Sequence, residues 1–244
     1  MTTPVWYDVF LDVPRAGWQR SVEFWAAATG LTPSPARGED GQFLTLLPGG
    51  GTSCVRMQAI DGGPRVHLDV ASHDRDALLQ RALGLGATRA WHYHDVPVLR
   101  SPGGLLLCLT LAEPEPHLAR TGEPILDQVC LDIPPSQWET EVAFWHQLTG
   151  RDITTGRSDP FVRLVDPDPA GGLRFLLQRL DEDRPTVSAH ADIAVADRPA
   201  EVARHRELGA EQVAEHQAWT IMRAPEGHIY CLTDRDPGTG HPRP

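Results

Sequence analysis

The sequence repeats itself over most of its length, and this repeat constrains the fold more than any other feature. Residues 65–70 read RVHLDV, and residues 188–193 read SAHADI. The sequence around them repeats at two constant offsets, 120 for residues 8–30 with 128–150 and 123 for residues 67–109 with 190–232. Offsets held over such lengths predict two copies of one structural module.

Each copy opens with a strand followed by an amphipathic helix. Residues 7–13 and 126–133 are rich in β-branched and aromatic side chains, and prolines follow both. Apolar side chains at i, i+4 and i+7 mark the core-facing side of each helix, namely Trp18, Val22, Trp25, Trp138, Val142 and Trp145. Gly30 and Gly150 suit the left-handed position after a helix. Residues 136–139 (SQWE) predict a capping box at the start of the second helix.

The remainder of each copy reads as further strands and one more helix. Strands are predicted at 42–47, 53–60, 105–111, 161–165, 173–180 and 228–233, hairpin turns at 48–51 and 166–172, and helices at 74–83 and 198–208. Each half therefore reads as two βαβββ units, which predicts an α+β fold with two tandem modules. We place module 1 at 1–112, a proline-rich linker at 113–124, module 2 at 125–236 and a flexible tail at 237–244.

Composition and charge limit the classes of partner that the protein can bind. The chain has 244 residues, a net charge of −11 and no long charged run, which argues against a nucleic acid or an anionic membrane as partner. Neither Lys nor Asn occurs, so a lysine Schiff base and an asparagine oxyanion donor are excluded. The four Cys are dispersed without a C-x-x-C pair, and the N-terminus has no signal pattern. We expect a cytoplasmic protein whose partner is a small molecule.

Several motifs together resemble the vicinal oxygen chelate superfamily, which includes glyoxalases, bleomycin-resistance proteins and extradiol dioxygenases. The motifs are Phe-Trp-x3-Thr-Gly, the His-x-Asp strand, the Leu-Gly-Ala helix end and Pro-x-Gly before the last strand. Nearly the whole chain takes part, and tandem glyoxalase-like members are the most similar. The resemblance implies that paired βαβββ units form a curved sheet around a cavity, with metal ligands or substrate contacts on inward strand positions.

The resemblance also implies which residues face inward. They are Asp8, Gln58, His67 and Cys108 in the first module, and Gln128, Gln178, His190 and Cys231 in the second. Asp8, His67 and Cys108 could form a three-ligand zinc site with an open position, and Gln128, His190 and Cys231 form a weaker set. Cys stands where metal-dependent members carry Glu. Because neither half has two His and one carboxylate, ring-cleaving dioxygenase chemistry is disfavoured.

Other polar and aromatic residues are candidates for binding or catalysis. Asp69 and Asp192 lie two residues after each His, on the same face of the strand, where a carboxylate could orient the imidazole or accept a substrate donor. Trp91 and Trp219 could contact a planar ligand at the rim. Each residue also has a structural reading, since an inward His can be a hydrogen-bonded core residue and Cys a small apolar one.

Two functions follow from these residues. The first is a binding protein that takes up a small planar or aromatic metabolite or antibiotic without an obligatory metal. The second is a lyase or isomerase in which His67, Asp69, His190 and Asp192, or a divalent Zn, Ni or Mn ion, polarise a carbonyl and move a proton. Either a monomer or a homodimer is compatible with a chain that already contains two modules.

Overall fold

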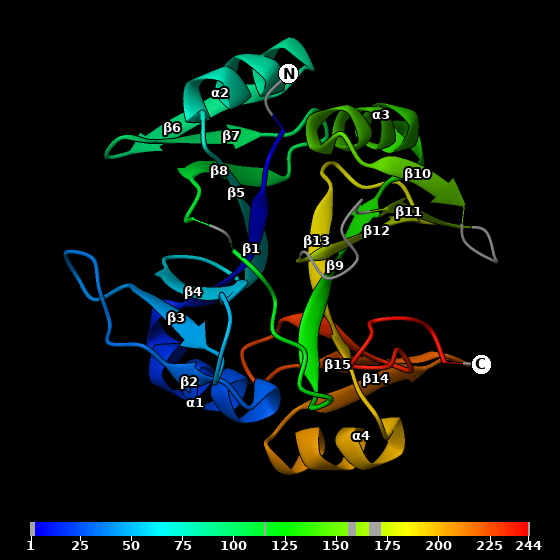
Figure 1. The fold of residues 1–244 in the computed structure, drawn as a ribbon. Coiled ribbons are helices and arrows are strands. Elements are labelled where there is room, and N and C mark those ends of the chain that lie inside the picture. The colour runs from blue at the N-terminus through cyan, green and yellow to red at the C-terminus, as the bar shows by residue number, and fades with distance from the viewer. Residues whose placement is uncertain (1–2, 115, 156–159, 166–171, 244) are drawn as a thin grey trace. The chain divides into compact units, whose positions relative to one another are not determined.

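The computed structural model describes residues 3–114, 116–155, 160–165 and 172–243. The fold is α+β, as predicted, with an eight-stranded mixed sheet and two α-helices in each module (Figure 1). Module 1 contains β1 (Trp6–Pro14), α1 (Trp18–Thr29), β2 (Thr32–Pro33), β3 (Phe43–Leu47), β4 (Val55–Ile60), β5 (Arg65–Ser72), α2 (Arg75–Gly84), β6 (Thr88–Tyr93), β7 (Val96–Arg100) and β8 (Leu106–Leu111).

Module 2 repeats the same elements in the same order. They are β9 (Ile125–Ile133), α3 (Trp138–Thr149), β10 (Asp152–Thr155), β11 (Phe161–Val165), β12 (Arg174–Arg179), β13 (Ser188–Ala194), α4 (Arg198–Glu207), β14 (Glu211–Glu215), β15 (Trp219–Arg223) and β16 (Ile229–Thr233). The first helices start at Trp18 and Trp138, 120 residues apart, and the second at Arg75 and Arg198, 123 apart. The predicted duplication is therefore confirmed.

Both sheets have the same strand order. It is β2-β3-β4-β1-β5-β8-β7-β6 in module 1 and β10-β11-β12-β9-β13-β16-β15-β14 in module 2. The pairs β5 with β8 and β13 with β16 are parallel. Hence the predicted His-x-Asp strand of each module lies beside the predicted Cys strand.

Two details differ from the expectation. The short strands β2 and β10 were missed, because two or four residues are too few to show a period. The capping box was also wrong: Ser136 donates from its Oγ to Asp183 Oδ1 at 2.6 Å, and the N-cap Gln137 makes no side-chain cap bond. A 3₁₀ turn (Pro135–Gln137) precedes α3 and delays its start to Trp138. Most of the turn predicted at 166–172 lies outside the described residues.

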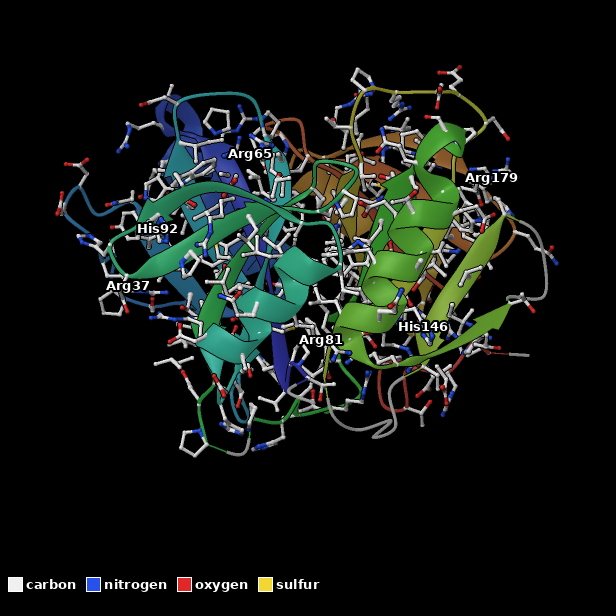
Figure 2. The ribbon with its side chains drawn as sticks, turned by 90° about the horizontal axis from the view of Figure 1, so that it is seen from above. Arg37, Arg65, Arg81, His92, His146 and Arg179 are labelled. Atoms are coloured by element: carbon white, nitrogen blue, oxygen red, sulfur yellow. The ribbon has the colours of Figure 1, made fainter. Side chains whose placement is uncertain are left out.

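The chain packs into two compact units that differ from the two sequence modules. Unit 1 consists of Met1–Val9, His67–Pro116 and Val129–Ala189, and unit 2 of Phe10–Val66, His117–Gln128 and His190–Pro244. Each unit therefore joins the second βαβββ piece of one module to the first piece of the other. In unit 1, for example, Arg81 of α2 donates through Nε to the carbonyl of Gln147 of α3 at 3.1 Å, and Figure 2 labels Arg81 on this helix pair.

Each unit contains a fully buried tryptophan. Trp145 and Trp25 are both 0% exposed, as their helix periodicity predicts. Trp145 Nε1 donates to Glu141 Oε2 at 2.8 Å in unit 1, and Trp25 Nε1 donates to Glu226 Oε1 at 2.6 Å in unit 2. The carboxylate comes from the helix in unit 1 and from the turn before the last strand in unit 2. Gly103 stands where the second copy has Glu226.

Gly103 is needed because Glu141 occupies the space next to it. The amide of Gly103 donates to Glu141 Oε1 at 2.5 Å. A Cβ at this position would lie 2.5 Å from Val187 Cγ2 and 2.9 Å from Glu141 Oε1. We expect Gly103→Ala to reduce the free energy of unfolding by about 1–3 kcal/mol through overpacking, measured by urea denaturation. Gly84→Ala is the control, because nothing lies within 4 Å of its added Cβ; equal effects of the two changes would contradict this packing.

A buried histidine in α4 makes the stability of the chain depend on pH. Arg204 Nη2 lies 3.1 Å from His205 Nε2, and Tyr230 Oη lies 2.8 Å from His205 Nδ1. Burial, and then the charge of Arg204, lower the pKa of His205 to about 4.

The resulting pH dependence has a definite sign. The pKa of His205 is lower in the folded than in the unfolded protein. The stability gained from keeping this imidazole neutral is therefore complete above pH ~6.5 and is lost as the pH falls toward about 4. We expect the wild type to lose up to about 3 kcal/mol more than His205→Gln over this window, measured by urea denaturation at several pH values. If the free energy of unfolding changed with pH equally in both proteins, His205 would have the same pKa in the folded and unfolded states, and the prediction would be wrong.

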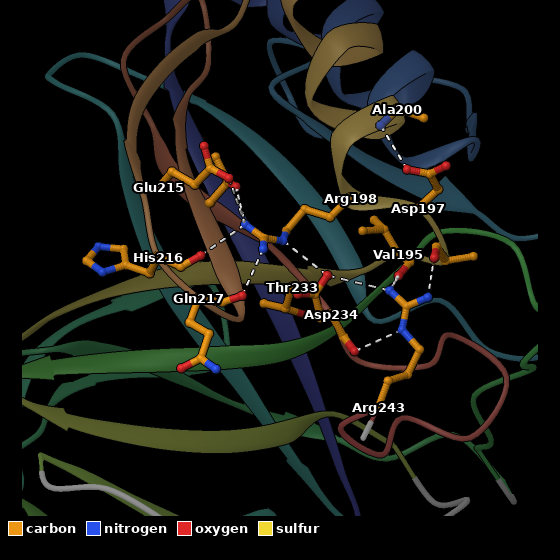
Figure 3. A network of polar contacts seen from close by, with 12 residues as sticks. Val195, Asp197, Arg198, Ala200, Glu215, His216, Gln217, Thr233, Asp234 and Arg243 are labelled. Carbon is orange, nitrogen blue, oxygen red and sulfur yellow. Dashed lines mark hydrogen bonds and ion pairs between the residues drawn. The ribbon is translucent and has the colours of Figure 1, made fainter.

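The C-terminal segment makes defined contacts in unit 2 (Figure 3). Arg243 donates from Nη2 to the carbonyl of Val195 at 2.8 Å and from Nε to the carbonyl of Asp234 at 3.1 Å. Arg198 donates from Nε to the carboxylate of Asp234 at 3.0 Å. The flexibility expected for 237–244 stays a prediction, but residue 243 is held by several bonds. None of the helices in the described ranges is long and apolar enough to cross a bilayer.

Candidate functional site

Each module brings one His, one Asp and one Cys together. On β5, His67 and Asp69 share a face, and Asp69 lies opposite Cys108 of the parallel strand β8. The ligand atoms of these three side chains lie within 4.8 Å of one another. We call them the module 1 group.

The second module repeats the arrangement. Asp192 of β13 lies opposite Cys231 of β16, and His190 precedes Asp192 by two positions. The ligand atoms of these three side chains also lie within 4.8 Å of one another. We call them the module 2 group. The sequence predicted His and Cys together through the resemblance, and it placed Asp69 and Asp192 on the His face; the structure joins all three.

The distances within the groups are short. His190 Nε2 lies 3.4 Å from Asp192 Oδ1 and 3.6 Å from Cys231 Sγ. In module 1, His67 Nε2 lies 3.7 Å from Asp69 Oδ1. His67, His190, Asp192 and Cys231 are all buried. Polar and ionisable groups concentrated in this way are expensive to bury without partners, which is typical of a binding or catalytic site.

Two of the three ligand separations in the module 2 group suit a tetrahedral metal ion. An ion with metal–nitrogen and metal–oxygen bonds of about 2.0–2.1 Å and a metal–sulfur bond of about 2.3 Å separates its nitrogen and oxygen ligands by roughly 3.4 Å, and its nitrogen and sulfur ligands by roughly 3.6 Å. The observed separations are 3.4 Å and 3.6 Å. Nitrogen, oxygen and thiolate sulfur together are a donor set that zinc accepts. These two separations agree with such an ion, and the ligand atoms of Asp192 and Cys231 lie within 4.8 Å of each other.

Gln128 fixes one carboxylate of this group. From β9, its Nε2 donates to Asp192 Oδ2 at 2.6 Å, and the side chain is buried. Since Asp192 Oδ1 faces His190, the amide holds the carboxylate in the orientation that the group requires. At the equivalent position of β1, Asp8 accepts a hydrogen bond from Trp6 Nε1 at 3.1 Å. The sequence named Asp8 and Gln128 as possible metal ligands, whereas the carboxylates grouped with His and Cys are those of Asp69 and Asp192. The bond from Gln128 to Asp192 was not predicted.

The other candidate residues lie on neighbouring strands. Gln58 of β4 pairs with Phe43 across the sheet, and Gln178 of β12 accepts from Cys130 Sγ at 3.7 Å. Trp91 of β6 is 46% exposed. Trp219 of β15 stacks on His216 with ring centroids 4.5 Å apart. The structure therefore does not add these four to either group, and their roles as ligand contacts stay predictions.

Two repeats of paired βαβββ units, with a His–Asp–Cys group on adjacent strands of each curved sheet, define a protein of the vicinal oxygen chelate class. The family model described as "Glyoxalase-like domain" matches residues 8–110 and again residues 128–233. The chain belongs to this glyoxalase-like family. The resemblance inferred from the sequence motifs is thereby confirmed. A search of curated proteins found no match.

Solved structures share the fold at low sequence identity. The Mn(II)-bound glyoxalase from Novosphingobium aromaticivorans is 18% identical, with a TM-score of 0.69 over 96% of this chain and 83% of that one. The 2,3-dioxygenase LapB from Pseudomonas sp. KL28 is 14% identical, with a TM-score of 0.64 over 100% and 96%. An extradiol ring-cleaving dioxygenase from B. fuscum is 12% identical, with a TM-score of 0.66 over 99% and 74%. At these identities the likeness concerns the fold alone.

Proposed function

We propose that the chain binds a small organic molecule at its His–Asp–Cys groups and that a divalent metal ion, preferably zinc, belongs to these sites. The observation that carries the proposal is the spacing in the module 2 group, 3.4 Å from nitrogen to oxygen and 3.6 Å from nitrogen to sulfur. The same three residue types recur in module 1 at equivalent strand positions. The Mn(II)-bound glyoxalase from Novosphingobium aromaticivorans, which shares the fold, supports the proposal.

The chain's own residues would divide the work at such a site. His, Asp and Cys would supply three ligands and leave a fourth position for a small molecule. When bound, the ion supplies Lewis acidity that polarises a carbonyl oxygen, the chemistry a lyase or isomerase requires. Gln128 would keep Asp192 oriented, and the buried strands around the groups would limit the access of water.

A metal-free binding protein is the second candidate, and one observation favours it. A separation of 3.6 Å between Cys231 Sγ and His190 Nε2 also suits a thiol hydrogen bond to an imidazole. Cys231 is flanked on β16 by the buried Tyr230 and Leu232, so it could equally serve as a core residue. In that case His and Asp alone would anchor a planar or aromatic ligand, as first expected from the sequence.

Metal analysis separates the two candidates. Protein purified without added metal would be measured by elemental mass spectrometry, then stripped with a chelator and titrated with Zn²⁺ by calorimetry. The proposal predicts metal in the purified protein and saturable zinc binding, at most one ion for each group. Stripped protein that shows no heat of zinc binding while it stays folded would reject the metal site and leave metal-free binding.

A further inference from the structure

We propose that the two groups have different roles: the module 1 group is the site that a small molecule reaches, and the module 2 group is closed by Gln128. This inference rests on the proposed function, because it assigns the ligand to one of the two His–Asp–Cys groups. Two observations carry it. The first is the difference in exposure between the two groups, and the second is that Asp8 in module 1 stands where module 2 has Gln128.

The module 1 group is the more open of the two. The side chain of Asp69 is 13% exposed and that of Asp192 is 4% exposed. Cys108 is half-buried, whereas Cys231 is buried. The imidazoles of His67 and His190 differ little, at 7% and 11%. Solvent, and hence a small molecule, therefore has more access to the carboxylate and the thiol in module 1.

Gln128 accounts for part of this difference. Its amide donates to Asp192 Oδ2 at 2.6 Å, so that one oxygen faces His190 and the other is occupied by a buried donor. The equivalent residue on β1 is Asp8, whose carboxylate accepts from Trp6.

The difference in exposure assigns the small molecule to one group. Both groups offer three protein ligands, so each would leave a fourth position of a metal ion open. The module 1 group has a partly exposed thiol and carboxylate, whereas a buried amide covers the carboxylate of the module 2 group. Module 1 would then bind the small molecule, and module 2 would stabilise its own sheet.

Thiol labelling of the whole chain tests the assignment. The stripped native protein would be treated with iodoacetamide, and the alkylated sites would be followed over time by peptide mass spectrometry. We expect Cys108 to react about tenfold faster than Cys231, since both neighbour a His and differ in exposure. Cys54, which is 2% exposed and belongs to neither group, is the internal control for local unfolding. A rate for Cys231 equal to or above that of Cys108 would overturn the proposal.

A variant tests the part played by Gln128. Gln128→Ala should raise the labelling rate of Cys231 toward that of Cys108, whereas Gln217→Ala, which changes an exposed side chain in the same unit, should not. Faster labelling of Cys54 in the variant would reveal unfolding, and the order of the Cys108 and Cys231 rates in the wild type would then decide. No change at Cys231 in a folded Gln128→Ala protein would reject the closing role.

The proposed function can fail separately from this inference. Zinc added before labelling should slow the alkylation of Cys108 if that thiol is a ligand. Fast labelling of Cys108 with no protection by zinc would reject the metal site and keep the assignment of the open group to module 1. Protection by zinc together with equal labelling rates for Cys108 and Cys231 would keep the metal site and reject the assignment of the open group to module 1.

Discussion

Replacing Trp145 by alanine should lower the free energy of unfolding by about 3–5 kcal/mol, the usual cost of truncating a fully buried aromatic side chain. Trp145 is 0% exposed, and its ring centroid lies 5.3 Å from that of Phe144 and 5.7 Å from that of Phe175. The change also removes the donor to Glu141 Oε2. Because Glu141 is 0% exposed, its oxygen finds no water to replace this donor, and the lost hydrogen bond adds to the cost.

Urea denaturation of the variant measures this loss. Trp91→Ala is the matched control, because this indole is 46% exposed and its removal should change stability by less than about 1 kcal/mol. The zinc affinity of Trp145→Ala should stay near that of the wild type while the protein is folded, since Trp145 belongs to neither group. If Trp145→Ala kept the wild-type denaturation midpoint, the packing described for unit 1 would be incorrect.

Removing both histidines of the groups should abolish zinc binding. We expect the double variant His67→Ala with His190→Ala to give no saturable heat with Zn²⁺, and each single variant to lose about one of two sites, because a three-ligand site depends on every ligand. Cys108→Ser and Cys231→Ser should each weaken the corresponding site in the same calorimetric titration. In a metal-free protein the Cys changes would affect packing alone.

His92→Ala is the control for these variants. His92 lies on the exposed strand β6 and belongs to neither group, so its removal should leave the zinc titration unchanged (Figure 2). Thermal unfolding of each variant would show whether the fold is retained. Full zinc binding by a folded double His variant would contradict the assignment of ligands.

Much of the fold could be predicted because the sequence contains two copies of the same module. The constant offsets, the buried Trp145 and the helix end at Gly150 agree with the structure, whereas Trp138 and Val142, predicted on the same core-facing side, are only half-buried. The capping box failed because a single turn beginning at Pro135 moved Ser136 toward Asp183, a contact 47 residues away in the chain. A local sequence pattern carries no information about a competing hydrogen bond to a residue so far away in the chain.

The site was predictable only in part for the same reason. His67 and Asp69 share a strand, so their common face follows from the two-residue period of a strand. The neighbour of Asp69 across the parallel pair, Cys108, could be placed only through the resemblance. The bond from Gln128 to Asp192 joins residues 64 apart, and it depends on side-chain orientations that a sequence pattern does not record.

Titration of the stripped protein with Co²⁺ tests the central claim most directly, because a thiolate ligand gives cobalt a sulfur-to-metal charge-transfer absorption band. The account predicts that this band appears and saturates near one ion for each intact group, and that Cys108→Ser and Cys231→Ser each remove about half of it. Folded wild-type protein that binds Co²⁺ without this band, or does not bind it, would contradict a His–Asp–Cys metal site.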